Sequence, residues 1–280
     1  MLKPSVLLGL ICFLWRTLPA QPISSIDTVT LYSDHLRLKA LLFKPKGPGP
    51  FPAVLFSHGS HSFRDSLQDV PKEMAELGAV FTKRKWIFLG VCRRGVGLSK
   101  GQGVSGGDLM IQSFNEKGQE GRNKTQMEIM EGGEYDDLIS GLNFLLNAKD
   151  VDKQRIALVG HSFGASLGLI LASKNKNLKA TVLFSPGGYT WDLSDLLRNR
   201  LIRAAREISI PFMVIHAEND YSTHPGIALD SLTFALHKTH LLKIYPPFGH
   251  SASDGHALIC KGADIWENDT FDFLDKYVLR

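Results

Sequence analysis

Five short runs of apolar residues, separated by longer stretches of helical character, constrain the fold of this chain more than any other feature. The runs occupy residues 53–56, 86–91, 156–159, 180–184 and 212–215. Continuous apolar runs of this length are typical of strands covered on both faces, as in parallel sheets. The predicted helices lie between and after them, at about residues 66–78, 131–148, 163–174, 225–237 and 265–278. This alternation predicts an α/β fold with a doubly wound, mostly parallel sheet.

An antiparallel hairpin is predicted before the first of these runs, from residues 28–33 and 36–43. In the second segment, apolar residues alternate with Arg37 and Lys39, which leaves one face in water. Residues 46–50, rich in glycine and proline, then break the strand pattern. The length of 280 residues fits one large domain, and we assign residues 21–280 to a single α/β domain.

Residues 1–20 have the features of a signal peptide. Lys3 is followed by a nearly uninterrupted apolar run over residues 6–15, and Ala20 provides a small residue at the expected cleavage point. The apolar run is about half the length that a membrane span of about 20 residues requires. We therefore expect an exported protein, secreted or periplasmic, without a stable membrane span. The alternative is an uncleaved anchor at the membrane interface.

Charge and cysteine content argue against several other classes of protein. The formal net charge of +4 falls to +2 without Lys3 and Arg16, and no long basic block is present, so nucleic acid is not an expected partner. Cys92 and Cys260 are the cysteines that follow the predicted signal peptide. They are too few for a disulfide framework, and their spacing does not indicate zinc. The sequence leaves open whether they pair.

The strongest motif is Gly160-His161-Ser162-Phe163-Gly164, which lies between the predicted strand 156–159 and the predicted helix 163–174. A sharp strand-to-helix turn of the form G-x-S-x-G exposes its serine hydroxyl at a helix N-terminus. The two glycines remove side chains that would obstruct the turn. Ser162 is therefore the candidate nucleophile, and a glycine-rich turn with an idle serine is the alternative.

A serine hydroxyl needs a base, and the base needs a carboxylate that orients it. His250 follows the predicted last strand, 241–245, and Gly249 would let its loop turn back toward Ser162. His256 is the nearest rival, and His161 is expected to pack beside the turn. Asp220 follows the strand 212–215 and is the candidate acid, with Glu218 as its alternative. The resulting chain order is Ser162, Asp220, His250.

Acyl transfer also requires N–H donors for the oxyanion. The backbone N–H of Phe163 directly follows the candidate nucleophile. The second donor is expected in the loop after strand 53–56, which reads Ser57-His58-Gly59-Ser60, and we assign it to the N–H of Ser60. An ordinary strand-ending turn is the alternative interpretation of this loop.

These stretches, together with Arg93-Arg94-Gly95-Val96-Gly97-Leu98-Ser99, resemble an α/β-hydrolase of the dienelactone-hydrolase-like group, over nearly all of residues 21–280. The resemblance implies the α/β-hydrolase fold and hydrolysis through an acyl-enzyme, with no cofactor and no metal. Dienelactone hydrolases proper use a cysteine nucleophile, whereas this chain has Ser162. Asp34-His35 also stands where relatives often have Asp-Gly.

We therefore expect an exported serine hydrolase that cleaves a carboxylic ester of a small acyl substrate. A serine peptidase or acyltransferase with the same triad is a second hypothesis, and a non-catalytic binding protein on a hydrolase scaffold is a third. The oligomeric state and the acyl specificity are left open.

The acyl pocket is less constrained by the sequence. The polar, glycine-rich residues 100–130 are long for a connection, which is consistent with a mobile lid. Tyr189 and Trp191 are candidates for the pocket wall, with core packing as an equal alternative. Arg93 and Arg94 could meet an acidic substrate, although a structural ion pair is favoured.

Overall fold

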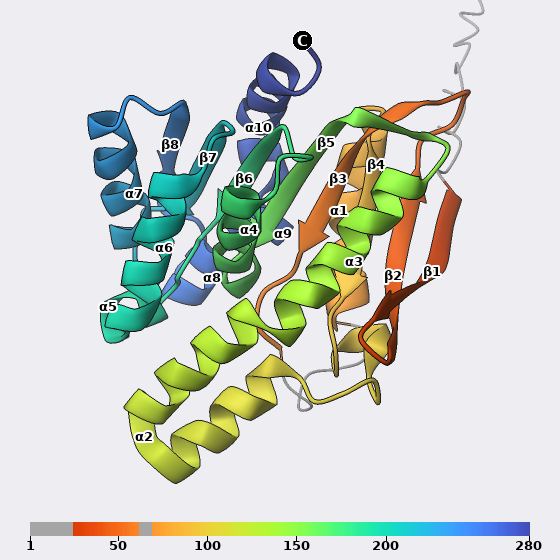
Figure 1. Cartoon of the computed structure of the whole chain (residues 1–280). Helices are drawn as coiled ribbons and strands as arrows, with labels where there is room; N and C mark the ends of the chain where they lie inside the picture. Colours follow the sequence, from red (N-terminus) through yellow and green to blue (C-terminus); the bar gives the residue numbers. More distant parts are fainter. Residues whose placement is uncertain (1–24, 62–68) are drawn as a thin grey trace, which may run out of the picture.

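The computed structural model describes residues 25–61 and 69–280 (Figure 1). Its eight strands are β1 (Ser25–Ser33), β2 (Leu36–Lys44), β3 (Phe51–Ser57), β4 (Ile87–Cys92), β5 (Val151–His161), β6 (Ala180–Phe184), β7 (Phe212–Ala217) and β8 (His240–Tyr245). Its helices are α1 (Asp69–Lys83), the 3₁₀ turn η1 (Gly97–Ser99), α2 (Gly106–Glu131), α3 (Gly133–Asn147), α4 (Phe163–Lys174), α5 (Thr190–Leu193), α6 (Asp195–Glu207), α7 (His224–Ala235), α8 (Ala252–His256), α9 (Leu258–Lys261) and α10 (Ala263–Tyr277).

All eight strands form one sheet in the order β1-β2-β4-β3-β5-β6-β7-β8. The β1–β2 and β2–β4 pairs are antiparallel, and the pairs from β4 through β3 to β8 are parallel. The prediction of a doubly wound, mostly parallel sheet with an N-terminal antiparallel hairpin is confirmed. The carboxyl ends of the parallel strands meet at one edge, where sites form in such sheets.

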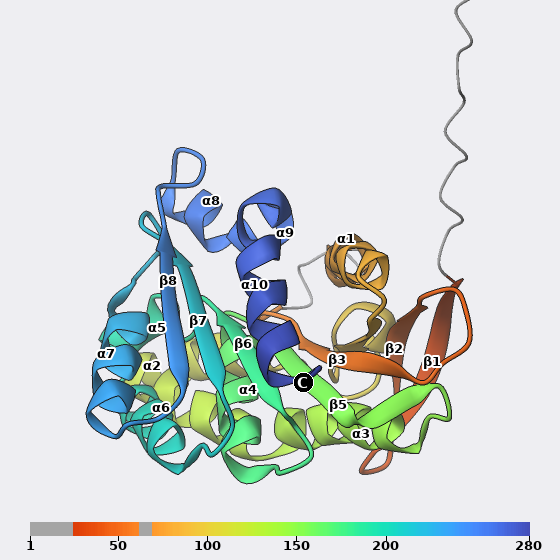
Figure 2. The ribbon, with the colours of Figure 1, turned by 90° about the horizontal axis from the view of Figure 1, so that it is seen from above.

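Helices cover both faces of the sheet and bury a separate apolar cluster on each side. Figure 2 shows α1, α9 and α10 on one face and α3, α4 and α6 on the other. Leu55 and Leu158 point into the cluster beneath α3 and α4, whereas Val54 and Ala157 point into the cluster beneath α1 and α10. Successive strand residues thus alternate between two buried faces, which explains the continuous apolar runs.

Residues 100–130 contain a long helix, α2, that the sequence did not predict. The helix is kinked at Gly118, whose φ of 67° and ψ of −161° interrupt it, and its two arms project from the body of the molecule in Figure 1. Ser105 caps its first turn by accepting a hydrogen bond from the N–H of Asp108. The segment is therefore a kinked helix, and its motion as a lid stays a prediction.

The predicted signal peptide, residues 1–20, lies outside the described residues. Across residues 25–61 and 69–280, no helix is both long enough and apolar enough to cross a membrane.

Candidate active site

Ser162 lies in a strained turn between β5 and α4. Its backbone has φ 54° and ψ −118°, outside the regions that most residues adopt, and it is the N-cap of α4. Its N–H donates a hydrogen bond to the carbonyl of Phe184 at the end of β6 (2.8 Å), and its own carbonyl accepts from the N–H groups of Ala165 and Ser166. A positive φ is costly for a residue other than glycine, and these hydrogen bonds hold Ser162 in that conformation at the carboxyl edge of the sheet.

The two glycines of the motif are required by close backbone approaches. A Cβ on Gly164 would lie 2.1 Å from the carbonyl oxygen of Ser57 and 2.2 Å from that of His58. A Cβ on Gly160 would lie 2.6 Å from the Cα of Ala165. Because backbone atoms cannot give way cheaply, only glycine lets α4 start this close to the end of β3.

Asp220 follows β7 and accepts hydrogen bonds from two histidines. Its Oδ1 lies 2.7 Å from Nδ1 of His256, and its Oδ2 lies 2.8 Å from Nδ1 of His216. The N–H of Tyr221 also donates to Oδ1 (2.7 Å). Glu218, the alternative acid, is exposed to solvent.

The charge states of Asp220 and His256 follow from their surroundings. Burial raises the pKa of Asp220, but the hydrogen bonds from His216 and His256 outweigh burial and hold that pKa well below its usual range. Burial lowers the pKa of His256 below its ordinary value, although Asp220 opposes this shift. The site is therefore an ionised carboxylate beside a neutral imidazole, with the Nδ1–H of His256 donated to Asp220 and its Nε2 left as the basic nitrogen.

The structure does not bring His250 to Ser162 or Asp220, in contrast to the sequence-based expectation. The side chain of His250 is exposed, and its backbone N–H donates to Oδ2 of Asp254 (3.1 Å). Gly249 has a φ of 66°, and a Cβ there would lie 2.4 Å from Cβ of Asp254. This glycine thus serves the start of α8 rather than a return of the loop toward Ser162.

His256, at the end of α8, occupies the place expected for His250. The signal that the sequence analysis missed is a capping box: Ser251 accepts from the N–H of Asp254, and Asp254 accepts from the N–H of Ser251. It marks a helix start directly after His250. The short helix then turns the chain so that its last residue, His256, points to Asp220.

His256 and Ser162 face the same cavity of about 320 Å³, which lies beside the start of α4. A Cβ built on Gly188 would lie 3.4 Å from Cε1 of His256 and 3.8 Å from Oγ of Ser162. Two side chains that are far apart in the sequence are thus brought within 4 Å of a common point.

Both predicted oxyanion donors belong to residues that line this cavity, Ser60 and Phe163. The N–H of Phe163 lies in the first turn of α4, where N–H groups have no intrahelical acceptor. The loop after β3 passes directly beside the nucleophile, since a Cβ on Gly59 would lie 3.6 Å from Cβ of Ser162. Ser60 and Phe163 thus lie in the wall of the same cavity as Ser162, and their role as oxyanion donors stays a prediction.

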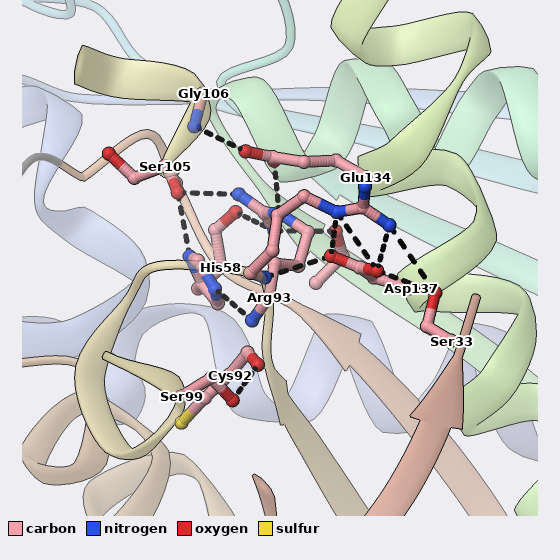
Figure 3. A network of polar contacts seen from close by, with 12 residues as sticks. Ser33, His58, Cys92, Arg93, Ser99, Ser105, Gly106, Glu134 and Asp137 are labelled. Carbon is pink, nitrogen blue, oxygen red and sulfur yellow. Dashed lines mark hydrogen bonds and ion pairs between the residues drawn. The ribbon is translucent and has the colours of Figure 1, made fainter. Parts of the chain in front are cut away.

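A buried ion pair, Arg93–Glu134, holds the loop after β3 in place, as Figure 3 shows. Arg93 donates to the carbonyls of His58 and Gly59, both at 2.8 Å, and its Nε lies 2.5 Å from Oε2 of Glu134. Arg94 pairs with Asp137 at 2.7 Å and with Asp34. Of the two interpretations weighed for Arg93 and Arg94, the structural ion pair is the one observed.

Of the two residues predicted for the wall of the pocket, only Tyr189 lines the cavity. Tyr189 lines the cavity, and its hydroxyl accepts a hydrogen bond from Arg122 of α2 (3.1 Å), whereas Trp191 is buried in the core. Met110 and Arg122 bring α2 to the cavity wall.

Cys92 and Cys260 are free thiols in different parts of the fold. Cys260 lies with Glu73 and His161, and one ligand atom from each residue falls within 4.8 Å of the others. Within the described residues, this group is a candidate for holding a metal ion.

Comparison with known proteins agrees with this architecture. A sequence model of the dienelactone hydrolase family matches residues 38–257. A search of curated proteins gives no significant match. The fold is similar to that of an acylaminoacyl peptidase of Pyrococcus horikoshii, with 16% identity and a TM-score of 0.65 over 92% of this chain and 43% of that one. The chain therefore spans less than half of the peptidase.

Two similar structures match over nearly their full length. An esterase of Pyrococcus furiosus has 14% identity and a TM-score of 0.65, covering 91% of this chain and 92% of that one. A dienelactone hydrolase of Anabaena variabilis has 16% identity and a TM-score of 0.59, covering 91% and 99%. At these identities the likeness establishes the α/β-hydrolase fold, and the family match extends over most of the sequence. The chain belongs to the dienelactone hydrolase family and is an enzyme of the hydrolase class.

Proposed function

We propose that this protein is a serine hydrolase of the carboxylesterase type, with Ser162 as nucleophile, His256 as base and Asp220 as the orienting acid. The observation that carries the proposal is the position of His256. Its Nδ1 lies 2.7 Å from Asp220, and its ring faces the cavity that contains the Ser162 hydroxyl. A buried, ionised carboxylate, a neutral imidazole and a strained serine turn form an acyl-transfer arrangement.

The reaction follows from these positions. His256 takes the proton of the Ser162 hydroxyl as Oγ attacks the acyl carbon, and the N–H groups of Ser60 and Phe163 stabilise the oxyanion. The oxyanion collapses as the alkoxide leaves with the proton from His256. A water activated by His256 then cleaves the acyl-enzyme, which releases the carboxylic acid and restores Ser162.

The cavity supports a small acyl substrate. Its volume of about 320 Å³ is at the lower end of the range of about 300–1,000 Å³ that is usual for small-molecule sites. Hydrolysis of a peptide or transfer to another acceptor would use the same residues, so product analysis has to separate these reactions.

The test combines labelling and kinetics. A fluorophosphonate probe should modify Ser162, and a screen of esters with different acyl lengths should give turnover that Ser162→Ala lowers by about 10⁴- to 10⁶-fold. Ser173→Ala, a serine near the other end of α4, is the matched control and should retain activity. Labelling at another residue, or unchanged esterase activity in Ser162→Ala, would contradict the proposal.

We also propose that the protein is exported, which the features of residues 1–20 support. Mass spectrometry of the protein recovered from an exporting host should show a chain that begins at Gln21. Recovery of the intact N-terminus inside the cell would argue against export.

A further inference from the structure

We propose that Glu73, His161 and Cys260 form a zinc site in the wall of the catalytic cavity, and that zinc bound there competes with the acyl substrate. The competition rests on the proposed function, whereas the zinc site itself does not. The three residues come from α1, from the end of β5 and from α9, so the fold, not a local motif, brings them together.

The distances suit zinc with little rearrangement. Oε1 of Glu73 lies 3.4 Å from Nδ1 of His161 and 3.3 Å from Sγ of Cys260. Zinc bonds of about 2.0–2.3 Å in a tetrahedron place ligand atoms about 3.3–3.6 Å apart. All three ligand atoms lie within 4.8 Å of one another, so a modest closure between His161 and Cys260 completes the set.

His161 directs one ring nitrogen to Glu73 and the other to a backbone carbonyl. Its Nε2 lies 3.0 Å from the backbone carbonyl of His256, which can only accept, so Nε2 carries the hydrogen. Nδ1 is the atom that faces Oε1 of Glu73, and the carboxylate favours a proton on it, so zinc would displace that proton to bind there. Metal-binding histidines typically donate their other N–H to a carbonyl or a carboxylate in this way.

The chemistry of the donors selects the ion. A thiolate and an imidazole favour zinc over magnesium or calcium, which prefer oxygen ligands. On binding, the Cys260 thiol loses its proton to solvent, as does His161 where it is protonated, and bonds form from zinc to sulfur, nitrogen and oxygen. One thiolate and one carboxylate then balance the two positive charges, which suits side chains of Glu73 and His161 that are only 11% and 13% exposed.

The position of the site explains the expected competition. Glu73, His161 and Cys260 all line the cavity that contains Ser162, and a Cβ on Gly59 would lie 3.5 Å from Nδ1 of His161 and 3.6 Å from Cβ of Ser162. Three protein ligands leave a fourth zinc position, which opens into the same cavity. A zinc ion with its water would therefore occupy space needed by the acyl group.

Binding of Zn²⁺ to the full chain, measured against a chromophoric chelator, tests the site. We expect one equivalent bound, and Co²⁺ in its place should give a thiolate charge-transfer band. Cys260→Ala and Glu73→Gln should each weaken binding by about 100-fold or more, since losing even an outer-shell partner costs about 10- to 100-fold. Glu76→Gln, an exposed carboxylate on the same helix, is the matched control and should bind as the wild type does.

Thermal unfolding shows whether each variant is folded, and Cys260→Ser provides a second cysteine variant of similar size. Wild-type binding in the Cys260 variants, or binding that depends on His256 instead, would overturn the site.

In the activity experiment, Zn²⁺ should raise KM for an ester with little change in kcat, and this effect should be lost in Cys260→Ala. An enzyme that hydrolyses esters but binds no zinc would overturn the zinc site alone, and a protein that binds zinc but lacks hydrolase activity would overturn the proposed function alone.

Discussion

At the scale of single residues, His216 has a position that the proposed mechanism does not require. Its imidazole is fully buried and donates from Nδ1 to Oδ2 of Asp220, opposite the oxygen that faces His256. Its Nε2 has no hydrogen-bond partner in the part of the chain that the structure describes. We infer that His216 is a positioning residue, which holds the carboxylate so that Oδ1 meets His256.

His216→Leu removes this donor, and we expect kcat to fall by about 10- to 100-fold, the equivalent of a hydrogen bond to a charged group of about 1.5–3 kcal/mol. The acidic limb of the pH profile should also move to higher pH, because a carboxylate with one donor fewer holds the proton of His256 more firmly. His216→Asn keeps an N–H near Nδ1 and should recover much of the rate. If His216→Leu and His216→Asn had the same kcat and the same pH profile as each other, the positioning role would be contradicted.

The pH dependence of the wild type follows from His256. The base must be neutral to accept the Ser162 proton, so activity is present above its pKa and is lost as the pH falls through it. Burial lowers this pKa below its ordinary value, despite the opposing effect of Asp220. The acidic limb of kcat/KM should therefore lie below about 6.5. A limb well above pH 7 would show that another group, or a different environment for His256, controls the reaction.

Sequence reasoning works for those site residues whose position depends on local structure. Ser162 lies between a strand and a helix that are both visible in the sequence, and Asp220 follows a strand by a few residues. The choice between His250 and His256 depends on how α8 turns the chain, which the proximity of a histidine to a strand end does not show. The Glu73–His161–Cys260 group depends on contacts between distant elements, which spacing cannot indicate.

At the scale of elements, α2 is the clearest departure from the sequence prediction. Its two arms project from the body of the molecule, and five of its eight buried residues are glycine or polar. The apolar periodicity that identifies helices packed on the sheet is therefore weak. By contrast, all eight strands were predictable: the inner strands are continuous apolar runs buried on both faces, the hairpin strand β2 alternates, and β8 is a short run before the final loop.

Gly118 makes the kink in α2 testable. A φ of 67° with a ψ of −161° is a region that is open essentially to glycine alone, and the space around its Cα is otherwise free. Gly118→Ala should therefore lower the free energy of unfolding by about 1–3 kcal/mol through backbone strain alone. Urea denaturation checks this, with Asn115→Ala in the exposed part of the same helix as the control. Unchanged stability in Gly118→Ala would mean that α2 is straight or flexible at this position.

At the scale of the whole molecule, the Arg93–Glu134 pair links three parts of the fold. Arg93 directly follows β4, and its guanidinium holds the loop after β3. Its partner Glu134 lies in the first turn of α3 and also accepts a hydrogen bond from the N–H of Gly106 at the start of α2. Both side chains are almost completely buried. The pair thus ties the loop after β3 to the starts of α2 and α3.

Arg93→Ala should lower the free energy of unfolding by about 3–5 kcal/mol, because it leaves the Glu134 carboxylate buried without its partner. Turnover should also fall, since the carbonyls of His58 and Gly59 lose the hydrogen bonds from the guanidinium. Arg155→Ala removes a half-exposed arginine 3.6 Å from Asp152 and should change stability by about 1 kcal/mol or less. Equal effects of the two substitutions in chemical denaturation would contradict this role for Arg93.

In the proposed triad, the fold selects His256, and not His250, as the base for Ser162. The most direct measurement compares His256→Ala with His250→Ala, using turnover of the best ester found in the screen together with fluorophosphonate labelling of Ser162. We expect His256→Ala to lower turnover by about 10⁴- to 10⁶-fold and to slow labelling severely, whereas replacing the exposed His250 should have little effect. Loss of activity in His250→Ala with near-normal activity in His256→Ala would contradict it.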